Sequence, residues 1–205
     1  MSFHEYGIGA TAVGLRGQDF VVLAAEKRIS YGGFVVSHAG KKVYKISDYL
    51  GVALAGLFAD MQAIAKIISA EMEYYMLTLG RPMKVEAAAR LLAAILYSNK
   101  YYPFFSEVLV GGIDLNGGSR LFVMDPLGSL IEDEYAAIGS GAPIAIGVIE
   151  REYRKDLSVS EARDLAVNAI KAAIERDAVS GGGIDILVIQ REGNVVRSTE
   201  ELVRL

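Results

Sequence analysis

The stretch YGIGATAVGLRGQDFVVLAAEKR, residues 6–28, predicts how the chain begins to fold. Two apolar, β-rich runs, Thr11–Leu15 and Phe20–Glu26, flank the polar sequence Arg16-Gly17-Gln18-Asp19. Runs of this length on either side of a short polar turn are typical of a β-hairpin. We therefore expect an antiparallel sheet whose first strand opens directly after Gly9.

Beyond this hairpin, the period of the apolar residues switches between strand and helix. Short strand-like runs end with the buried pattern Leu50–Gly56. Apolar residues then recur every three or four positions between Met61 and Met72, and again between Val85 and Leu96, which predicts two amphipathic helices. The remaining expected elements are strands at 106–114, 119–125 and 129–139, helices at 142–153 and from 158 to about 176, and a closing hairpin of 183–190 and 194–198.

The order of elements is strands, two helices, strands, two helices, strands. Ser158 and Glu161 have the spacing of a capping box at the start of the last helix. No Pro/Ser-rich linker or repeat divides the chain. This order predicts an α+β fold, a four-layer αββα sandwich in which two antiparallel sheets stack and each is covered by a helix pair.

Composition excludes several classes of function. The 205 residues carry a net charge of −4 without basic clusters, so nucleic-acid binding has little support. The chain has no cysteine and two histidines, His4 and His38, so disulfides and Cys-based zinc sites are excluded and a two-His metal site is poorly supported. We expect no metal and no cofactor.

The start of the chain and its apolar runs bear on location. Residues 1–9 have neither a basic start nor an apolar stretch, so they do not form a signal peptide. The most apolar run, 51–59, is far shorter than the roughly 20 residues that span a bilayer. We expect a cytoplasmic protein that does not contact membranes. Because 52% of the residues are hydrophobic, we also expect oligomerisation to cover part of the apolar surface.

Two kinds of local motif have an ordinary structural interpretation. The Gly-rich sequences at 139–141 and 180–183 lack the residues of a phosphate-binding loop and are typical of tight turns. Glu26, the neighbouring Lys27-Arg28 and the pair Lys41-Lys42, taken alone, are typical of solvated surface charges, and Asp177 of a loop residue. Spacing alone does not bring Glu26, Lys42 and Asp177 together.

Taken in order, however, the motifs of the chain resemble those of the β-type subunits of the proteasome core particle, particularly archaeal ones. The resemblance runs from Gly9 to the last strands and needs no gap between Gly9 and Asp60. The matching residues are Ala12-Val13-Gly14, Ala25-Glu26-Lys27-Arg28, Gly33-Phe34, Lys41-Lys42, Ala55-Gly56, Asp60, Gly111-Gly112-Ile113-Asp114, Asp125-Pro126-Leu127-Gly128, Gly139-Ser140-Gly141 and Arg176-Asp177-x-x-Ser180-Gly181.

The resemblance implies the fold of the N-terminal-nucleophile hydrolases and a threonine endopeptidase chemistry. In this family the nucleophile is an N-terminal threonine, exposed when a leader is cut off after a glycine, and its own α-amine acts as the general base. The resemblance places Lys42 beside the nucleophile, where its charge favours the alkoxide, and Glu26 beside Lys42. It implies that Asp177, Ser180 and Ser140 orient the terminal amine.

The resemblance also implies an oxyanion donor and a specificity pocket. The backbone N–H of Gly56 would be the oxyanion donor, at a position that needs a residue without a side chain. Ile29, Leu54 and Phe58 fall where the family lines a narrow apolar pocket. Residues 1–9 would be the leader, and 10–205 a single β-type domain.

The nucleophile position is the departure from the family pattern, because Ala10 occupies it. A methyl group cannot attack a carbonyl, so we expect a silent subunit that retains its leader. The alternative is that Thr11 acts after cleavage behind Ala10. Side chains alternate along a strand, so a one-residue shift directs Thr11 away from Lys42. Ala10 is either an engineered knock-out or the natural residue of an inactive paralogue, and Ala12, where relatives often carry threonine, favours the natural case.

The resemblance finally implies the partners. These are α-type and other β-type subunits in stacked heptameric rings, unfolded polypeptide substrates, and a regulatory ATPase that acts through the α ring. A further alternative is that the chain is a self-compartmentalising relative with a simpler ring and no α-type partners, or an unrelated amidohydrolase with an N-terminal nucleophile. The motifs at 125–128 and 176–181 argue against the amidohydrolase.

Overall fold

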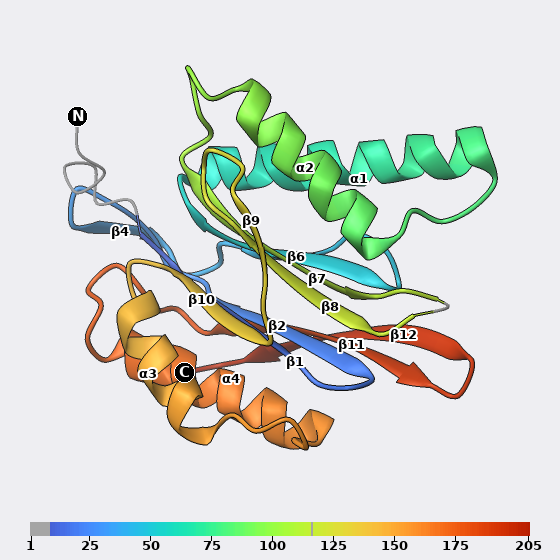
Figure 1. Ribbon diagram of the computed structural model, residues 1–205. Coiled ribbons are helices and arrows are strands. Elements are labelled where there is room, and N and C mark those ends of the chain that lie inside the picture. The colour runs from blue at the N-terminus through green and yellow to red at the C-terminus, as the bar shows by residue number, and fades with distance from the viewer. Residues whose placement is uncertain (1–8, 116) are drawn as a thin grey trace.

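The computed structural model describes residues 9–115 and 117–205, and within them the chain folds into a four-layer α+β sandwich. Two antiparallel sheets lie face to face, with one pair of helices above them and another pair below (Figure 1). This arrangement confirms the predicted αββα architecture. The leader predicted for residues 1–9 lies outside the described residues except for Gly9.

The first sheet contains the N-terminal hairpin and the C-terminal hairpin side by side. Its strands, in spatial order, are β10 (Tyr135–Gly139), β1 (Thr11–Arg16), β2 (Phe20–Glu26), β11 (Ile184–Glu192) and β12 (Val195–Val203). The β1–β2 pairing confirms the hairpin predicted over residues 16–19. The last strand is longer than the predicted 194–198, because its pairing with β11 continues until Ile184 lies opposite Val203.

The second sheet begins and ends with short strands. Its members, in spatial order, are β5 (Val43–Lys45), β6 (Leu50–Gly56), β7 (Ser106–Ile113), β8 (Ser119–Met124) and β9 (Leu130–Glu132). A separate two-stranded hairpin, β3 (Ile29–Tyr31) and β4 (Phe34–Ser37), projects from the end of β2 beside the second sheet (Figure 1).

Four helices among the described residues cover the outer faces of the two sheets. They are α1 (Phe58–Leu79), α2 (Val85–Ser98), α3 (Ala142–Glu152) and α4 (Val159–Ile174). Helix α1 ends at Gly80, which adopts a left-handed φ of 63° as its C-cap. Helix α4 begins with the predicted capping box of Ser158 and Glu161. None of these helices is long and apolar enough to cross a membrane.

The core has three parts, one between the sheets and one under each helix pair. Side chains alternate between the two faces of the first sheet along β1. Ala10 and Ala12 therefore face the second sheet, whereas Val13 and Leu15 pack against the α3–α4 layer. Burying one face of each sheet against the other, and the opposite face against helices, removes most apolar side chains from water. This packing is the dominant favourable contribution to folding.

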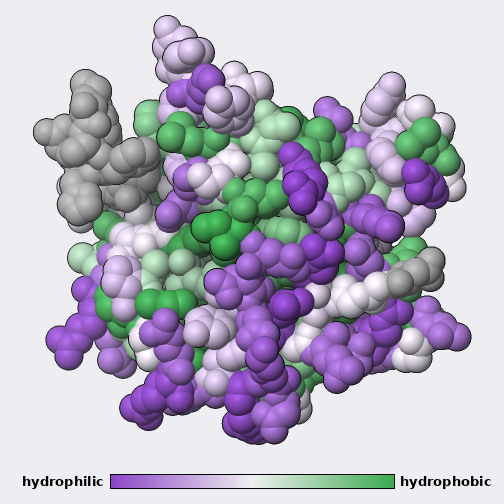
Figure 2. Space-filling model, viewed as in Figure 1, coloured by the Kyte–Doolittle hydropathy of each residue, from purple (hydrophilic) through white to green (hydrophobic). Residues whose placement is uncertain are grey.

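Exposed large apolar side chains gather on one of the two helix layers. Hydrophilic residues cover most of the layer formed by α3 and α4, whereas hydrophobic residues reach the surface around α1, α2 and the middle of the face (Figure 2). The exposed aromatic and aliphatic residues in and directly after α1 and α2 are Tyr74, Met76, Leu77, Leu79, Tyr97, Tyr101, Tyr102 and Phe105. Such a concentration is typical of an interaction surface.

Candidate active site

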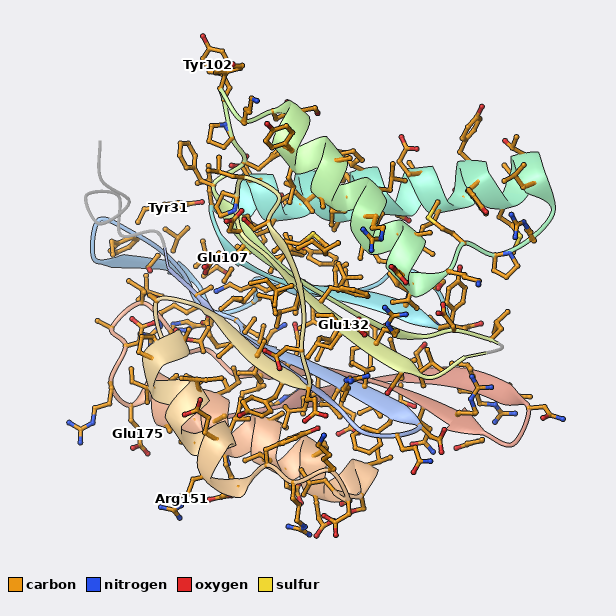
Figure 3. All side chains as sticks on the ribbon, in the orientation of Figure 1. Tyr31, Tyr102, Glu107, Glu132, Arg151 and Glu175 are labelled. Carbon is orange, nitrogen blue, oxygen red and sulfur yellow. The ribbon has the colours of Figure 1, made fainter. Side chains whose placement is uncertain are left out.

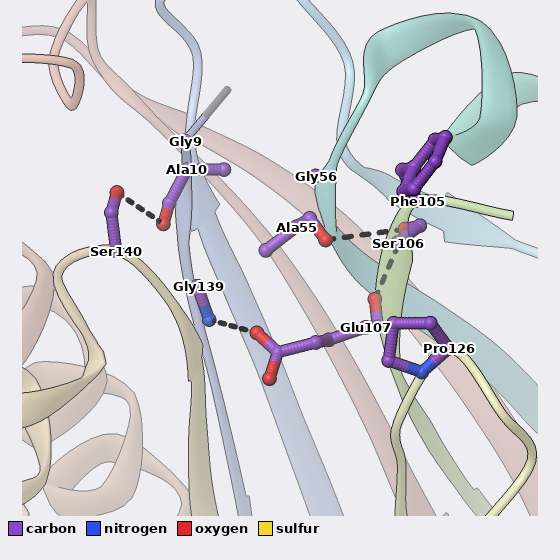
Figure 4. Close-up of a pocket in the computed structure, with 10 residues that line it drawn as sticks. All are labelled: Gly9, Ala10, Ala55, Gly56, Phe105, Ser106, Glu107, Pro126, Gly139 and Ser140. Atoms are coloured by element: carbon purple, nitrogen blue, oxygen red, sulfur yellow. Dashed lines mark hydrogen bonds between the residues drawn. The ribbon is translucent and has the colours of Figure 1, made fainter. Parts of the chain in front are cut away.

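The candidate site lies at the start of β1, where residue 10 enters the sandwich. Ala10 is fully buried between Ser140, on the loop after β10, and Gly56, at the end of β6 (Figure 4). A cavity of about 310 Å³ opens beside it. Six of the residues that line this cavity are Ala10, Ala55, Gly56, Phe105, Gly139 and Ser140.

The side chain of Thr11 faces away from this cavity. Its Oγ1 lies 2.8 Å from the Oγ of Ser180, and the residue has no exposed surface. A Cβ added to Gly141 would collide with the Thr11 hydroxyl, so a glycine is needed for the chain to pass this close. Thr11 is therefore held on the α3–α4 side of the first sheet, and Ala10 lines the cavity.

A buried ion pair joins Glu26, at the end of β2, to Lys42, directly before β5 of the second sheet. The Lys42 Nζ donates to Glu26 Oε1 and, at 2.6 Å, to the carbonyl oxygen of Arg28. Glu26 is 0% and Lys42 1% exposed, so their interpretation from local sequence as solvated charges is wrong. The neighbouring Lys41 does behave as a surface charge, with half of its side chain exposed beside Glu200.

Burial controls the proton affinities of this pair. Burial raises the pKa of Glu26, and the charge and hydrogen bond of Lys42 oppose this rise. Two backbone N–H groups, those of Arg28 and Gly181, also donate to Glu26 Oε2, at 2.7 Å and 2.8 Å. Burial lowers the pKa of Lys42, and the carboxylate of Glu26 opposes this effect. A lysine in this state holds its proton less tightly than one in water.

Three polar residues from the C-terminal half form a network on the other side of Ala10. Asp177 Oδ2 accepts hydrogen bonds from Ser140 Oγ at 2.6 Å and from Ser180 Oγ at 2.7 Å. Ser140 Oγ also lies 3.3 Å from the carbonyl oxygen of Ala10. The charge of Asp177 reaches Lys42 as well, where it favours the protonated amine. Residues that the sequence places far apart thus surround one backbone position.

Gly56 is the last residue of β6 and lines the wall of the cavity. Its φ of +143° disfavours any residue with a side chain, and an added Cβ would collide with the carbonyl oxygen of Phe105. Two hydrogen bonds fix the facing segment: Leu57 N donates to Phe105 O at 2.7 Å, and Phe105 N donates to Asp60 Oδ2 at 2.7 Å. This arrangement fixes the end of β6, where Gly56 lines the same cavity as Ala10.

A second, much narrower cavity adjoins the first at Gly9 and Gly56. Its wall includes Lys42 and two of the three predicted pocket residues, Ile29 and Phe58. The third, Leu54, has no exposed surface and packs in the core under α1 and α2. Alternation along β6 explains this position, since Leu54 shares its face with the buried Val52.

Two residues that help to build the site were not predicted from the sequence. Arg28 holds the Glu26–Lys42 pair through its backbone and donates from its side chain to the carbonyl oxygen of Ala178 at 2.8 Å. Glu107, on β7, accepts the N–H of Gly139 at 2.6 Å. A charged residue inside the apolar run of β7 is the signal that could have identified Glu107.

The sandwich of two sheets and two helix pairs is the fold of the N-terminal-nucleophile hydrolases, and the site lies at the start of its first strand. A profile of the family described as "Proteasome subunit" matches residues 7–189. The chain belongs to the proteasome subunit family, and within it to the β-type subunits.

Three archaeal relatives show how far the similarity extends. Proteasome subunit beta 1 of Hyperthermus butylicus is 65% identical over 202 residues, which cover 98% of this chain and 99% of the relative. Proteasome subunit beta 2 of Pyrobaculum aerophilum is 54% identical over 201 residues, or 98% and 97% of the two chains. Proteasome subunit beta 1 of Ignicoccus hospitalis is 54% identical over 183 residues, or 89% and 91%.

Proposed function

We propose that this chain is a non-catalytic β-type subunit of the proteasome core particle, a threonine-type endopeptidase complex that degrades unfolded proteins. One observation carries the proposal: the methyl group of Ala10 lies beside the cavity, whereas the nearest hydroxyl on β1, that of Thr11, is buried against Ser180. Acyl transfer needs a nucleophilic atom within contact of the scissile carbonyl. The side chain at position 10 has no such atom.

To the groups around Ala10 we assign the roles that they would have in a catalytic relative. Lys42, held by Glu26, would favour an alkoxide at position 10, and Asp177, Ser140 and Ser180 would orient a terminal amine. The backbone N–H of Gly56 would bind the oxyanion. Ile29 and Phe58 would line the pocket for the residue before the cut.

Without a nucleophile, the chain also cannot remove its own leader. Residues 1–9 therefore stay attached in the proposed subunit, and 10–205 form its single domain. The chain contributes wall, pocket surface and subunit contacts to the particle. The exposed apolar residues on and after α1 and α2 supply surface for such contacts.

The proposed partners follow from the family, whose members assemble with one another in rings. We propose stacked heptameric rings in which this chain contacts α-type and other β-type subunits in the cytoplasm. A regulatory ATPase would act on the particle through the α ring, and unfolded polypeptides would be its substrates.

Intact-mass measurement of the assembled particle tests the proposal. The chain is expressed with its α-type and β-type partners, and the mass of each subunit is determined. We expect this chain to keep residues 1–9, apart from the initiator methionine, and to remain unlabelled by an epoxyketone inhibitor. We expect Ala10→Thr to lose residues 1–9 and to become labelled.

A second substitution separates the proposal from its alternative, an active subunit that uses Thr11. Thr11→Val keeps the shape of the side chain and removes its hydroxyl. If Thr11 were the nucleophile, the natural chain would begin at Thr11 and react with the inhibitor, and Thr11→Val would abolish both. Either property of the natural chain would contradict a silent subunit.

A further inference from the structure

The wider cavity beside Ala10 has an acidic side chain, Glu107, in its lining. Glu107 carries the one ionisable group among the described residues that line it, and the others are glycines, alanines, serines, a proline and a phenylalanine. Figure 3 shows Glu107 between the two sheets, far from the outward-pointing Arg151 and Glu175. A carboxylate in a mostly apolar cavity gives that cavity a local negative charge.

Among the described residues, one of the two carboxylate oxygens of Glu107 has a hydrogen-bond partner. Oε2 accepts the N–H of Gly139 at 2.6 Å, and no lysine, arginine or histidine of the described residues forms an ion pair with the group. Figure 4 shows the side chain extending from β7 toward Gly139, with one oxygen on the dashed line to the Gly139 nitrogen, and Glu107 is among the residues that line the cavity. A partly buried carboxylate with one hydrogen bond retains strong acceptor capacity, which a cation satisfies best.

The rest of the lining suits the aliphatic part of a basic side chain. Phe105 and Pro126 offer apolar surface near the carboxylate. Lysine and arginine pack their methylene groups along such surfaces while the charged end reaches a polar partner. The volume of about 310 Å³ is sufficient for one such side chain.

We infer that this cavity binds a lysine or arginine side chain of a polypeptide that lies across residue 10. The inference rests on the proposed function, because the narrow cavity with Ile29 and Phe58 is assigned there to the residue before the peptide bond that faces Ala10. The two cavities adjoin at Gly9 and Gly56. A chain that crosses this point places its next residue beside Glu107.

The test uses particles that contain the Ala10→Thr chain and internally quenched peptides. The peptides are identical except for lysine, norleucine or glutamate directly after the cleaved bond, and wild-type particles measured alongside give the cleavage due to other subunits. Glu107→Gln is the test substitution, since glutamine removes the charge and still offers an acceptor to Gly139 N. The matched control is Glu73→Gln, on the exposed face of α1.

We expect kcat/KM for the lysine peptide to exceed that for norleucine by about fivefold, as for a partly exposed ion pair. Glutamate should be disfavoured. The lysine preference should disappear in Ala10→Thr/Glu107→Gln and persist in Ala10→Thr/Glu73→Gln. An equal preference in both double variants overturns the inference.

A binding measurement keeps this inference separate from the proposed function. If Ala10→Thr particles show no added cleavage, the assignment of residue 10 fails, whereas the subsite can still be tested. Peptides carrying a benzophenone next to lysine or norleucine are crosslinked to wild-type particles. Stronger crosslinking of this chain by the lysine peptide, lost in Glu107→Gln, supports the subsite, and equal crosslinking by both peptides overturns it.

Discussion

The hydroxyl of Thr11 lies 2.8 Å from that of Ser180, on the side of the first sheet that faces the helices. Through Ser180 it joins the chain of hydrogen bonds that continues to Asp177 and Ser140. Thr11 is thereby linked to the polar network around Ala10 without reaching the cavity.

This contact predicts a structural role for Thr11. Thr11→Val should lower the free energy of unfolding by about 1 kcal/mol, because one buried hydrogen bond is lost while Ser180 keeps its bond to Asp177. Peptidase activity of the particle should not change. Denaturant unfolding and peptide cleavage measure the two effects, and Thr199→Val, on the exposed face of β12, is the control. Loss of activity with unchanged stability would contradict this role.

The Glu26–Lys42 pair should be strongly coupled. Lys42→Met or Glu26→Gln alone should each cost about 3–5 kcal/mol, because each leaves a buried group without its partner. The double variant should recover a large part of this loss. A double-mutant cycle of unfolding free energies measures the coupling. The same cycle on the exposed pair Lys41–Glu200 should give a coupling free energy of no more than about 1 kcal/mol. Similar coupling energies for the two pairs would contradict the prediction that burial strengthens the coupling.

The capping box of α4 predicts a specific dependence of stability on pH. Hydrogen bonds from Ser158 and from Arg154 lower the pKa of Glu161 to about 2. Because the folded-state pKa lies below the unfolded value of about 4.3, the stabilisation is complete above that value and is lost as the pH falls toward 2. The unfolding free energy in urea should therefore fall more steeply between pH 5 and 2 for the natural chain than for Glu161→Gln. Equal slopes would count against this assignment, and Glu73→Gln serves as the control.

Gly139 predicts a steric limit at the site. Gly139→Ala should destabilise the protein by at least about 2 kcal/mol, because the residue has a φ of +90° and the new Cβ would collide with the carbonyl oxygen of Ala10. Gly147→Ala, in α3 with open space around it, should instead stabilise the protein by about 0.5–1 kcal/mol. Thermal unfolding compares the two. Equal effects would show that backbone conformation does not limit residue 139.

The fold could be predicted from the sequence because its elements are encoded locally. The apolar runs of β1 and β2 on either side of a polar turn, the three- and four-residue spacing in α1 and the capping box of α4 each specify an element from nearby residues. The end of β12 could not be predicted in the same way. It is an edge strand with mostly exposed, polar side chains, so its sequence lacks the apolar period that marks a strand.

The site was less accessible to sequence reasoning because its members come from distant segments. Glu26 and Asp177 approach Lys42 only through the stacking of the two sheets and the loop after α4. Their local sequences are those of surface charges, and only the resemblance to a family indicated that they meet. The resemblance placed Leu54 in the pocket, whereas the structure places it in the core, on the face of β6 that it shares with Val52.

The bond between Glu107 and Gly139 also has a mechanical consequence. It ties β7 of one sheet to the end of β10 of the other, at the edge where the wider cavity opens. Relative sliding of the two sheets at this edge would stretch that bond. A molecule bound to the Glu107 carboxylate would therefore restrict the relative motion of both sheets. Its binding should be measurable as slower amide hydrogen exchange at Gly139.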